Sequence, residues 1–323
     1  MAKYKVALIE VFSPDVVAEI RSCVPEEFDL VATTTHEEQE KIAVATGADF
    51  ILVGGVPLSA AVIAAAPNVR LIQKWGIGVD KIDLKAAAKR GIPVAITAGA
   101  NAIPVAELAI ALMLAVYRKI PYVDRKLRQG VWLKSEMRSV SYQINGKTVG
   151  IIGLGNIGRQ VARRVRAFNA RVIYYDMVRP TPEVEAEVGA TYKPLDDLLA
   201  QADIITLHTP LTDETRNLIN AHAFSLMKPK AILINTSRGP VIDEPALVEA
   251  LKTGKIMAAG LDTFAKEPAQ AGNPLFELEN VVVTPHIGGG VIDNVANSAR
   301  HCFGNMQKVL NGEPLSPADV IPL

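Results

Sequence analysis

The chain has 323 residues, enough for two domains, and its 49% hydrophobic and 21% charged residues are typical of a globular protein. Lysine plus arginine equals aspartate plus glutamate at 34 each, so no excess of positive charge indicates nucleic-acid binding. The two cysteines, Cys23 and Cys302, are far apart and no cluster has metal-ligand spacing, so we expect free thiols and no metal.

Five short apolar runs in the first hundred residues have the composition of buried strands. They are Lys5–Val11, Asp29–Thr33, Phe50–Gly54, Arg70–Trp75 and Pro93–Thr97. The segments between them favour helices, at Pro14–Cys23, Glu37–Thr46, Ser59–Ala66 and Leu84–Arg90. Strands that are apolar on both faces and alternate with helices predict a parallel sheet covered on both sides.

A long apolar helix is predicted next, with Pro104 in its first turn and its end near Arg118. It is apolar nearly all round, so we expect it to be buried, either between domains or at a subunit contact. The apolar stretch Ala102–Tyr117 is shorter than the ~20 residues that span a bilayer, and the run Val6–Ile9 is too short for a signal peptide. We therefore expect a cytoplasmic protein that does not contact membranes.

The alternation of strands and helices then restarts, which predicts a second α/β domain. Strands are expected at Thr148–Ile152, Arg171–Asp176, Ile204–His208, Ala231–Asn235, Met257–Leu261 and Val281–Thr284, and helices at Ile157–Phe168, Leu195–Ala200, Ala221–Leu226 and Glu244–Lys252. A last helix, about Val291–Leu310, ends at Asn311-Gly312, a typical helix stop. Because this helix follows the final strand, it is able to cross back to the first domain.

The segment Gly153-Leu154-Gly155-Asn156-Ile157-Gly158 has the spacing of a dinucleotide-binding loop. It follows a predicted strand and opens a predicted helix, whose N-terminal N–H groups attract phosphate. In this geometry Gly153 permits the tight turn, Gly155 lets the backbone approach a pyrophosphate, and Gly158 lets helix and strand pack closely.

Asp176 ends the next predicted strand, 18 residues beyond Gly158 (176 − 158). Its carboxylate is expected to accept hydrogen bonds from the adenosine ribose and to repel a 2′-phosphate, which favours NAD over NADP. Arg179, three residues later, opposes this preference because a guanidinium binds phosphate well. We expect Asp176 to dominate.

Three further segments at predicted strand ends carry the residue types that reduction of a 2-oxo acid requires. They are Asn235–Gly239, Gly260–Pro268 and Thr284–Gly289. Ligands of parallel α/β sheets bind beyond the carboxyl ends of the strands, so Arg238, Asp262, Glu267 and His286 are expected along one edge. A guanidinium holds carboxylate and carbonyl oxygens, an imidazole transfers a proton, and a carboxylate orients the imidazole.

These motifs, in this order, resemble those of the D-isomer-specific 2-hydroxyacid dehydrogenase family. The resemblance extends from Trp75-Gly76-Ile77-Gly78-Val79-Asp80 through the glycine loop to Pro285-His286. It implies a Rossmann NAD-binding domain at 101–290 and a flavodoxin-like substrate-binding domain at 1–100 plus 291–323. It also implies a homodimer that pairs through the NAD-binding domain, and an enzyme that interconverts a 2-oxo acid and a D-2-hydroxy acid.

The resemblance assigns roles to single residues. It implies that Arg238 binds the substrate carboxylate and carbonyl, that His286 is the general acid/base, and that Glu267 hydrogen-bonds His286. It implies that residues 75–78 bind the substrate carboxylate from the side opposite Arg238. The residues implied to contact the NAD cofactor are Gly153, Gly155, Asn156, Ile157, Gly158, Asp176, Thr209, Thr236, Asp262 and Gly288.

Trp75 departs from the family pattern, in which small or polar residues are common at this position. It either caps an apolar substrate pocket or packs in the core, and the stretch Trp132–Tyr142 also matches the family poorly. Two other functions stay open, an NAD(H)-sensing, corepressor-like binding protein and a relative of formate dehydrogenase, although that branch carries glutamine in place of Glu267. Phosphoglycerate, glyoxylate or hydroxypyruvate, and lactate-like substrates are all compatible with the motifs.

Overall fold

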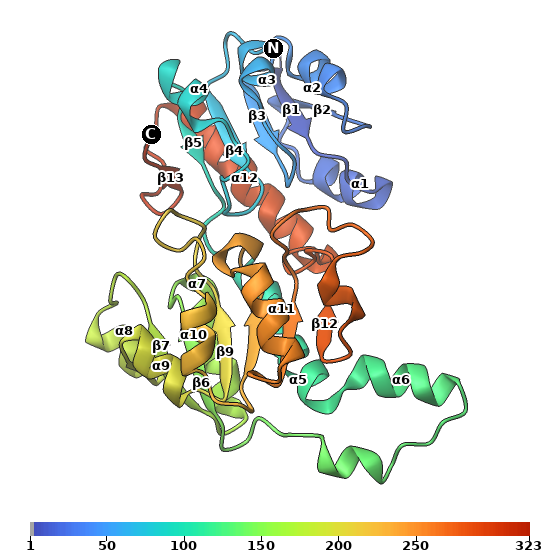
Figure 1. The fold of residues 1–323 in the computed structure, drawn as a ribbon. Coiled ribbons are helices and arrows are strands. Elements are labelled where there is room, and N and C mark those ends of the chain that lie inside the picture. Colours follow the sequence, from blue (N-terminus) through green and yellow to red (C-terminus); the bar gives the residue numbers. More distant parts are fainter. Residues whose placement is uncertain (1–2) are drawn as a thin grey trace. The chain divides into compact units, whose positions relative to one another are not determined.

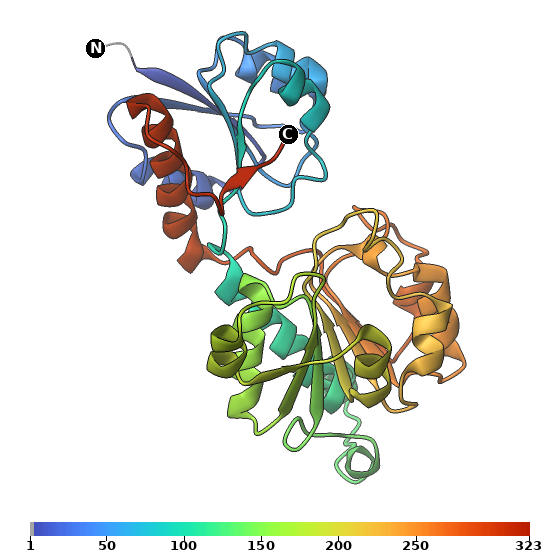
Figure 2. The same ribbon diagram turned by 90° about the vertical axis from the view of Figure 1, so that its left-hand side faces the viewer.

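The fold consists of two compact units. The computed structural model describes residues 3–323. The first unit comprises the chain up to Asn101 together with Gly290–Leu323, and the second unit comprises Ala102–Gly289. Within each unit, helices cover both faces of one sheet (Figures 1 and 2). The chain therefore crosses between the units twice.

The sheet of the first unit has six strands. They are β1 (Tyr4–Ile9), β2 (Phe28–Ala32), β3 (Phe50–Val53), β4 (Leu71–Lys74), β5 (Val94–Ala95) and β13 (Val320–Ile321). Their order is β13-β5-β4-β3-β1-β2, and β13 is antiparallel to β5 while the others are parallel. The parallel strands thus have the order 2-1-3-4-5, which is the flavodoxin-like order.

Alternating residues of these strands supply two apolar layers. Val6 and Leu8 face a cluster that includes α1 (Pro14–Ser22) and α12 (Val295–Asn311), whereas Ala7 and Ile9 face the opposite cluster. The helices of the opposite face are α2 (Glu38–Ala45), α3 (Ala60–Ala64) and α4 (Leu84–Lys89). The predicted stop after α12 is confirmed, because Gly312 takes the left-handed conformation (φ 70°) that ends helices.

The sheet of the second unit has seven parallel strands. They are β6 (Thr148–Ile152), β7 (Arg171–Tyr175), β8 (Ala190–Tyr192), β9 (Ile204–Leu207), β10 (Ile232–Asn235), β11 (Ala258–Leu261) and β12 (Val281–Val283). Their order is β12-β11-β10-β9-β6-β7-β8. Counted from β6, this is the Rossmann order 3-2-1-4-5-6 with one more strand at the far edge.

Six helices cover this second sheet. Those that join the cluster of one face are α5 (Ala102–Arg118), α7 (Asn156–Ala167) and α8 (Pro182–Val188), and those of the other face are α9 (Leu195–Gln201), α10 (Ala221–Leu226) and α11 (Glu244–Lys252). The predicted burial of the long apolar helix α5 is confirmed, but the sheet of its own unit buries it, and not another domain or subunit as expected. It is buried on the sheet of the second unit, where Leu112 and Val116 lie against Gly260.

An arm of two short helices follows α5. It contains α6 (Ile120–Arg128) and the 3-10 turn η1 (Glu136–Ser139), and neither has a buried residue. Figure 1 shows this arm extending away from the sheet of the second unit. The remaining 3-10 turns are η2 (Gly239–Val241), η3 (Pro274–Glu277) and η4 (Ile292–Asn294). Across residues 3–323, no helix has the length and apolar character that crossing a membrane requires.

Candidate functional site

Six strands of the second unit end at one level. The strand register pairs Ile152 with both Tyr175 and Leu207 and then runs through Asn235 and Leu261 to Val283. The residues directly after these partners are Gly153, Asp176, His208, Thr236, Asp262 and Thr284. The strand order reverses between β6 and β9, which opens a crevice in such sheets. The carboxyl edge of this sheet is therefore the candidate site.

The glycine loop fills the centre of that edge. Gly153 has φ 95°, and a Cβ there would lie 2.7 Å from the carbonyl oxygen of His208. A Cβ on Gly158 would collide with the carbonyl oxygen of Gly153, whereas a Cβ on Gly155 would meet open space. Gly155 is the residue before α7, so this open space lies at a helix N-terminus, where N–H groups attract phosphate.

Asp176 lies against the glycine loop. Its Oδ2 accepts a hydrogen bond of 2.7 Å from the backbone N–H of Leu154, and its Oδ1 accepts one of 3.2 Å from that of Val178. The side chain is half-buried. These two bonds fix the carboxylate at the end of β7, beside the loop that is predicted to hold the pyrophosphate.

Buried polar atoms without a partner gather at the same edge. They include the hydroxyl oxygens of Thr209, Thr236 and Thr263 and the Nδ1 of His208, which follow β9, β10 and β11. Buried polar groups are normally hydrogen-bonded, so unpaired atoms in a row indicate a polar ligand. With the glycine loop and the N-terminus of α7, they fit a dinucleotide. Thr263 was not among the residues predicted from the sequence.

His208 is held uncharged at this edge. Its Nε2 lies 2.9 Å from the hydroxyl of Thr206, and burial lowers its pKa to about 3. A neutral imidazole carries one N–H and one lone pair, so the unpaired Nδ1 offers a hydrogen bond without a charge. From the sequence, its place at a strand end before Thr209-Pro210 is compatible with the cofactor site, although a structural role is favoured there.

His286 and Glu267 form a hydrogen-bonded pair after β12 and β11. His286 Nδ1 lies 2.9 Å from Glu267 Oε2, while Glu267 Oε1 accepts a bond of 3.3 Å from the backbone N–H of Phe264. The imidazole is 42% exposed and the carboxylate only 20%. His286 also has φ 55°, a backbone conformation that is uncommon outside glycine and that clusters at functional sites.

Asp262 holds the loop that carries His286. Its buried carboxylate accepts three hydrogen bonds, of 2.6 Å from the Thr284 hydroxyl and of 2.9 Å from the backbone N–H groups of Ile287 and Gly288. The Asp262 carbonyl oxygen also accepts a bond of 2.8 Å from the backbone N–H of His286. One side chain therefore fixes the segment on both sides of the histidine.

Arg238 lies on a tight turn after β10. The side chain of Asn235 shapes this turn, because its Oδ1 accepts bonds from the backbone N–H and the hydroxyl of Ser237 and its Nδ2 donates to the Arg238 carbonyl. A Cβ on Gly239 would collide with the backbone of Phe264. The arginine turn thus packs directly on the segment that leads to Glu267, and the fold brings both predicted residues to one edge.

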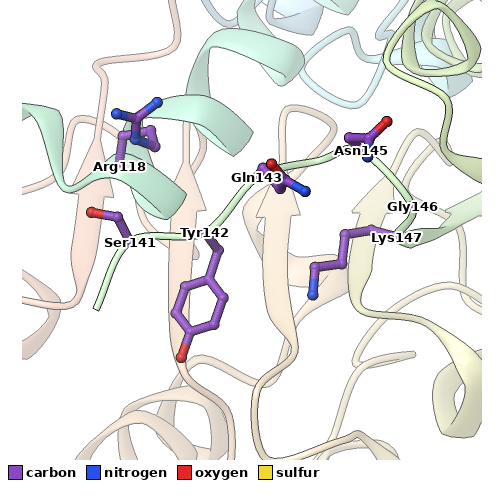
Figure 3. Close-up of a pocket in the computed structure, with 7 residues that line it drawn as sticks. All are labelled: Arg118, Ser141, Tyr142, Gln143, Asn145, Gly146 and Lys147. Carbon is purple, nitrogen blue, oxygen red and sulfur yellow. The ribbon is translucent and has the colours of Figure 1, made fainter. Parts of the chain in front are cut away.

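A separate hollow of about 430 Å³ lies at the start of β6 and the end of α5. It is lined by Arg118, Ser141, Tyr142, Gln143, Asn145, Gly146 and Lys147 (Figure 3). Lys147 and Lys230 lie 5.8 and 6.0 Å from the centre of the Tyr142 ring, so their charges already have an aromatic partner. None of the predicted site residues lines this hollow. Among residues 3–323, no group of three or more His, Cys, Asp or Glu side chains is placed to hold a metal ion.

Residues 75–78, the predicted substrate loop, lie in the first unit. They follow β4, and Gly76 takes φ 105° with its N–H bonded to the Thr97 hydroxyl at 2.9 Å. Trp75 is half-buried and packs on the core of this unit, with its ring 5.6 Å from that of Phe12. The other predicted site residues all lie in the second unit.

Comparisons with known proteins identify the kind of domain to which the second unit belongs. The family model "D-isomer specific 2-hydroxyacid dehydrogenase, NAD binding domain" matches residues 110–288. A glyoxylate reductase of Korarchaeum cryptofilum is 41% identical over 80% of this chain and 78% of that protein. A D-3-phosphoglycerate dehydrogenase of Archaeoglobus fulgidus is 42% identical over 82% of this chain but only 50% of that protein, so the match spans half of its length.

A solved structure extends the likeness to both units. The D-mandelate dehydrogenase of Rhodotorula graminis matches with a TM-score of 0.84 and 28% identity, covering 99% of this chain and 98% of that one. The chain belongs to the D-isomer-specific 2-hydroxyacid dehydrogenase family. It is therefore an oxidoreductase with an NAD-binding Rossmann domain, and the predicted family, fold class, enzyme class and cofactor are confirmed.

Proposed function

We propose that this protein reduces a 2-oxo acid to the D-2-hydroxy acid with NADH, and catalyses the reverse oxidation. The observation that carries the proposal is the His286–Glu267 pair, 2.9 Å apart, at the carboxyl edge of the Rossmann sheet. A carboxylate on one ring nitrogen fixes the tautomer and stabilises the protonated ring. The other nitrogen, Nε2, is left to exchange a proton with substrate oxygen.

In the proposed reaction, two positively charged side chains, Arg238 and protonated His286, act on the substrate. Bound NADH supplies the hydride to the carbonyl carbon. Arg238 holds the substrate carboxylate and the carbonyl oxygen with its planar fork of donors, so that negative charge developing on the oxygen meets a positive group. His286, protonated, gives its Nε2 proton to that oxygen, and in the oxidation it takes the proton back. Glu267 stabilises the imidazolium throughout.

We also propose roles on the cofactor side. The glycines of residues 153–158 and the first N–H groups of α7, at Asn156 and Ile157, hold the pyrophosphate. Asp176 accepts hydrogen bonds from the adenosine ribose. The unpaired hydroxyls of Thr209 and Thr236 support contacts to the rest of the dinucleotide. Asp262 acts mainly by fixing residues 284–288, including Gly288, because its carboxylate already accepts three hydrogen bonds there.

On the substrate side, we propose that residues 75–78 bind the carboxylate and that the Phe12–Trp75 pair contacts the substrate side chain. Two aromatic rings 5.6 Å apart at a sheet edge favour an apolar group. We therefore expect aryl or branched aliphatic 2-oxo acids to be better substrates than glyoxylate or a phosphorylated acid.

The test is a turnover assay with NADH and a panel of 2-oxo acids. The panel contains phenylpyruvate, 4-methyl-2-oxopentanoate, pyruvate, glyoxylate and 3-phosphohydroxypyruvate, and chiral chromatography identifies the product. We expect a D-hydroxy acid and the highest kcat/KM with the first two acids. A best rate with the phosphorylated acid would refute the proposed contact of the Phe12–Trp75 pair with the substrate side chain. NADH binding without turnover of any acid would refute the enzyme and favour a dinucleotide-sensing protein.

A further inference from the structure

Arg179 has the position of a phosphate-binding residue but its side chain is held elsewhere. It lies three residues beyond Asp176, on the exposed loop after β7. Its Nε and Nη2 bond both carboxylate oxygens of Glu185 on α8, at 2.7 and 3.1 Å. A bidentate arginine–carboxylate pair is stronger and more directional than a single charged hydrogen bond. The loop arginine is thus fastened to the next helix.

Two tyrosines complete this arrangement. The buried Tyr174 hydroxyl donates to Glu185 Oε1, and the Arg179 guanidinium lies 5.1 Å from the centre of the Tyr192 ring on β8. The Arg179 guanidinium and then the Tyr174 hydroxyl hold the pKa of Glu185 below its ordinary value, so the carboxylate stays charged at neutral pH. The Glu185 side chain is only 15% exposed. The position of Glu185 is therefore set by two groups, the Arg179 guanidinium and the Tyr174 hydroxyl.

We propose that Glu185 is a specificity-determining residue, which excludes NADP(H) by holding Arg179 away from the ribose that Asp176 binds. An arginine near this ribose is the usual means of binding a 2′-phosphate. Here the arginine is present in the sequence but its hydrogen-bonding fork is occupied by Glu185. Cofactor choice thus has two components, the charge of Asp176 and the restraint on Arg179. The inference rests on the proposed placement of the ribose at Asp176.

This proposal predicts a gain that depends on two substitutions. Asp176→Ser removes the charge that repels a 2′-phosphate but leaves Arg179 bound to Glu185. Adding Glu185→Gln keeps an acceptor for the Tyr174 hydroxyl and removes the carboxylate that neutralises Arg179. The freed guanidinium then reaches the phosphate, and we expect the NADPH/NADH affinity ratio to rise by at least about ten-fold over Asp176→Ser alone, since a charge-assisted hydrogen bond contributes this much or more.

The measurement is the Kd of NADPH and of NADH by fluorescence titration, with thermal melting of each variant to verify folding. Glu187→Gln in the Asp176→Ser background is the matched control, because Glu187 also lies on α8 and pairs with an arginine, Arg163. We expect no change of the ratio there. Adding Arg179→Ala to the double variant should abolish the gain. Should Glu185→Gln not fold, Tyr192→Leu tests the same restraint from the aromatic side.

The proposal is overturned if Glu185→Gln raises the ratio no more than Glu187→Gln does, or if Arg179→Ala leaves the gain intact. Because binding is measured without turnover, this result is independent of the reaction proposed above. If the enzyme is active with NADH but Glu185→Gln does not change the NADPH/NADH affinity ratio, only the proposed restraint of Arg179 by Glu185 is refuted. If no 2-oxo acid of the panel is reduced but Glu185→Gln still raises the NADPH/NADH affinity ratio, only the proposed reaction is refuted.

Discussion

Arg238 is the residue whose loss we expect to be most costly to turnover. With no net charge on the protein to attract an anion, a local cation must bind the substrate carboxylate. Arg238→Ala should lower kcat/KM by ~2–5 kcal/mol in transition-state free energy, the usual cost of removing one partner of a desolvated charge pair. Steady-state kinetics with the best acid of the panel measures it. Exposed Arg216→Ala is the matched control, and wild-type kcat/KM in Arg238→Ala would contradict the assignment.

The neutral His208 should make the stability of the folded protein depend on pH. The pKa of His208 is about 3 in the folded chain and 6.5 for an ordinary, solvated histidine. Between these two values the unfolded chain therefore binds a proton at this residue that the folded chain does not bind. The free energy of unfolding therefore falls as the pH is lowered from 6.5 towards 3, with a contribution of ~1.4 kcal/mol per pH unit from this residue.

Urea unfolding of the wild type and of His208→Gln between pH 4.5 and 7 isolates this contribution. The variant should lose less stability than the wild type as the pH falls. His222→Gln, an exposed histidine, controls for the loss of an imidazole as such. Parallel pH dependences for the wild type and His208→Gln would show that His208 is not held neutral.

For single residues, the sequence predicted which side chains belong to the candidate site better than it predicted the hydrogen bonds that hold them. Arg238, Glu267 and His286 were placed at strand ends because ligands bind beyond the carboxyl ends of parallel strands. The three bonds that Asp262 accepts from residues 284–288 were not foreseen, since they join segments 22 to 26 residues apart. Nor were the unpaired Thr263 hydroxyl and His208 Nδ1, because only coordinates reveal which buried atoms lack partners.

In the loop between β6 and α7, substitutions at two glycines should distinguish an effect on ligand binding from an effect on folding. A Cβ on Gly158 would collide with the Gly153 backbone, whereas a Cβ on Gly155 would meet no atom within 4 Å. Gly155→Ala should therefore leave the melting temperature of the free protein unchanged and raise the Kd of NADH. Gly158→Ala should lower the melting temperature as well. Equal destabilisation by the two substitutions would contradict the proposal that the space at Gly155 is reserved for phosphate.

The predicted helices and strands agree best with the structure where a run of apolar residues is long and is buried on both faces. Strands such as β1, β3, β9 and β10 are buried on both faces, and their composition alone indicates this. Two α-helices, α6 and α8, and two strands, β8 and β13, were missed, as were the 3-10 turns η1, η2 and η3. They are short, exposed or at a sheet edge, and β13 consists of two residues whose pairing with β5 no local pattern specifies. Such elements form through tertiary contacts and not through local preference.

At the scale of the whole molecule, the arm formed by α6 and η1 bears on assembly. Trp132 is 71% exposed and Leu127 55% exposed, and large apolar side chains grouped on a surface mark interaction sites. We propose that this arm pairs two copies of the chain into a homodimer. Leu127→Glu combined with Trp132→Ser should then give a monomer in light scattering coupled to gel filtration. Met177→Glu, another exposed apolar position of the second unit, is the control, and a wild-type monomer would refute the dimer.

The division of the first unit between two stretches of chain has a consequence during synthesis. Residues 102–289 leave the ribosome uninterrupted, so the second unit is able to fold as it emerges. At ~5–20 residues per second, those 188 residues (289 − 102 + 1) take about 10–40 s to make. Throughout that time the sheet face containing Leu8 and Phe50 lacks Phe303 and Met306, which arrive only with α12. Of the two units, the one that is begun first is completed last, and its nascent sheet exposes this apolar face until α12 is made.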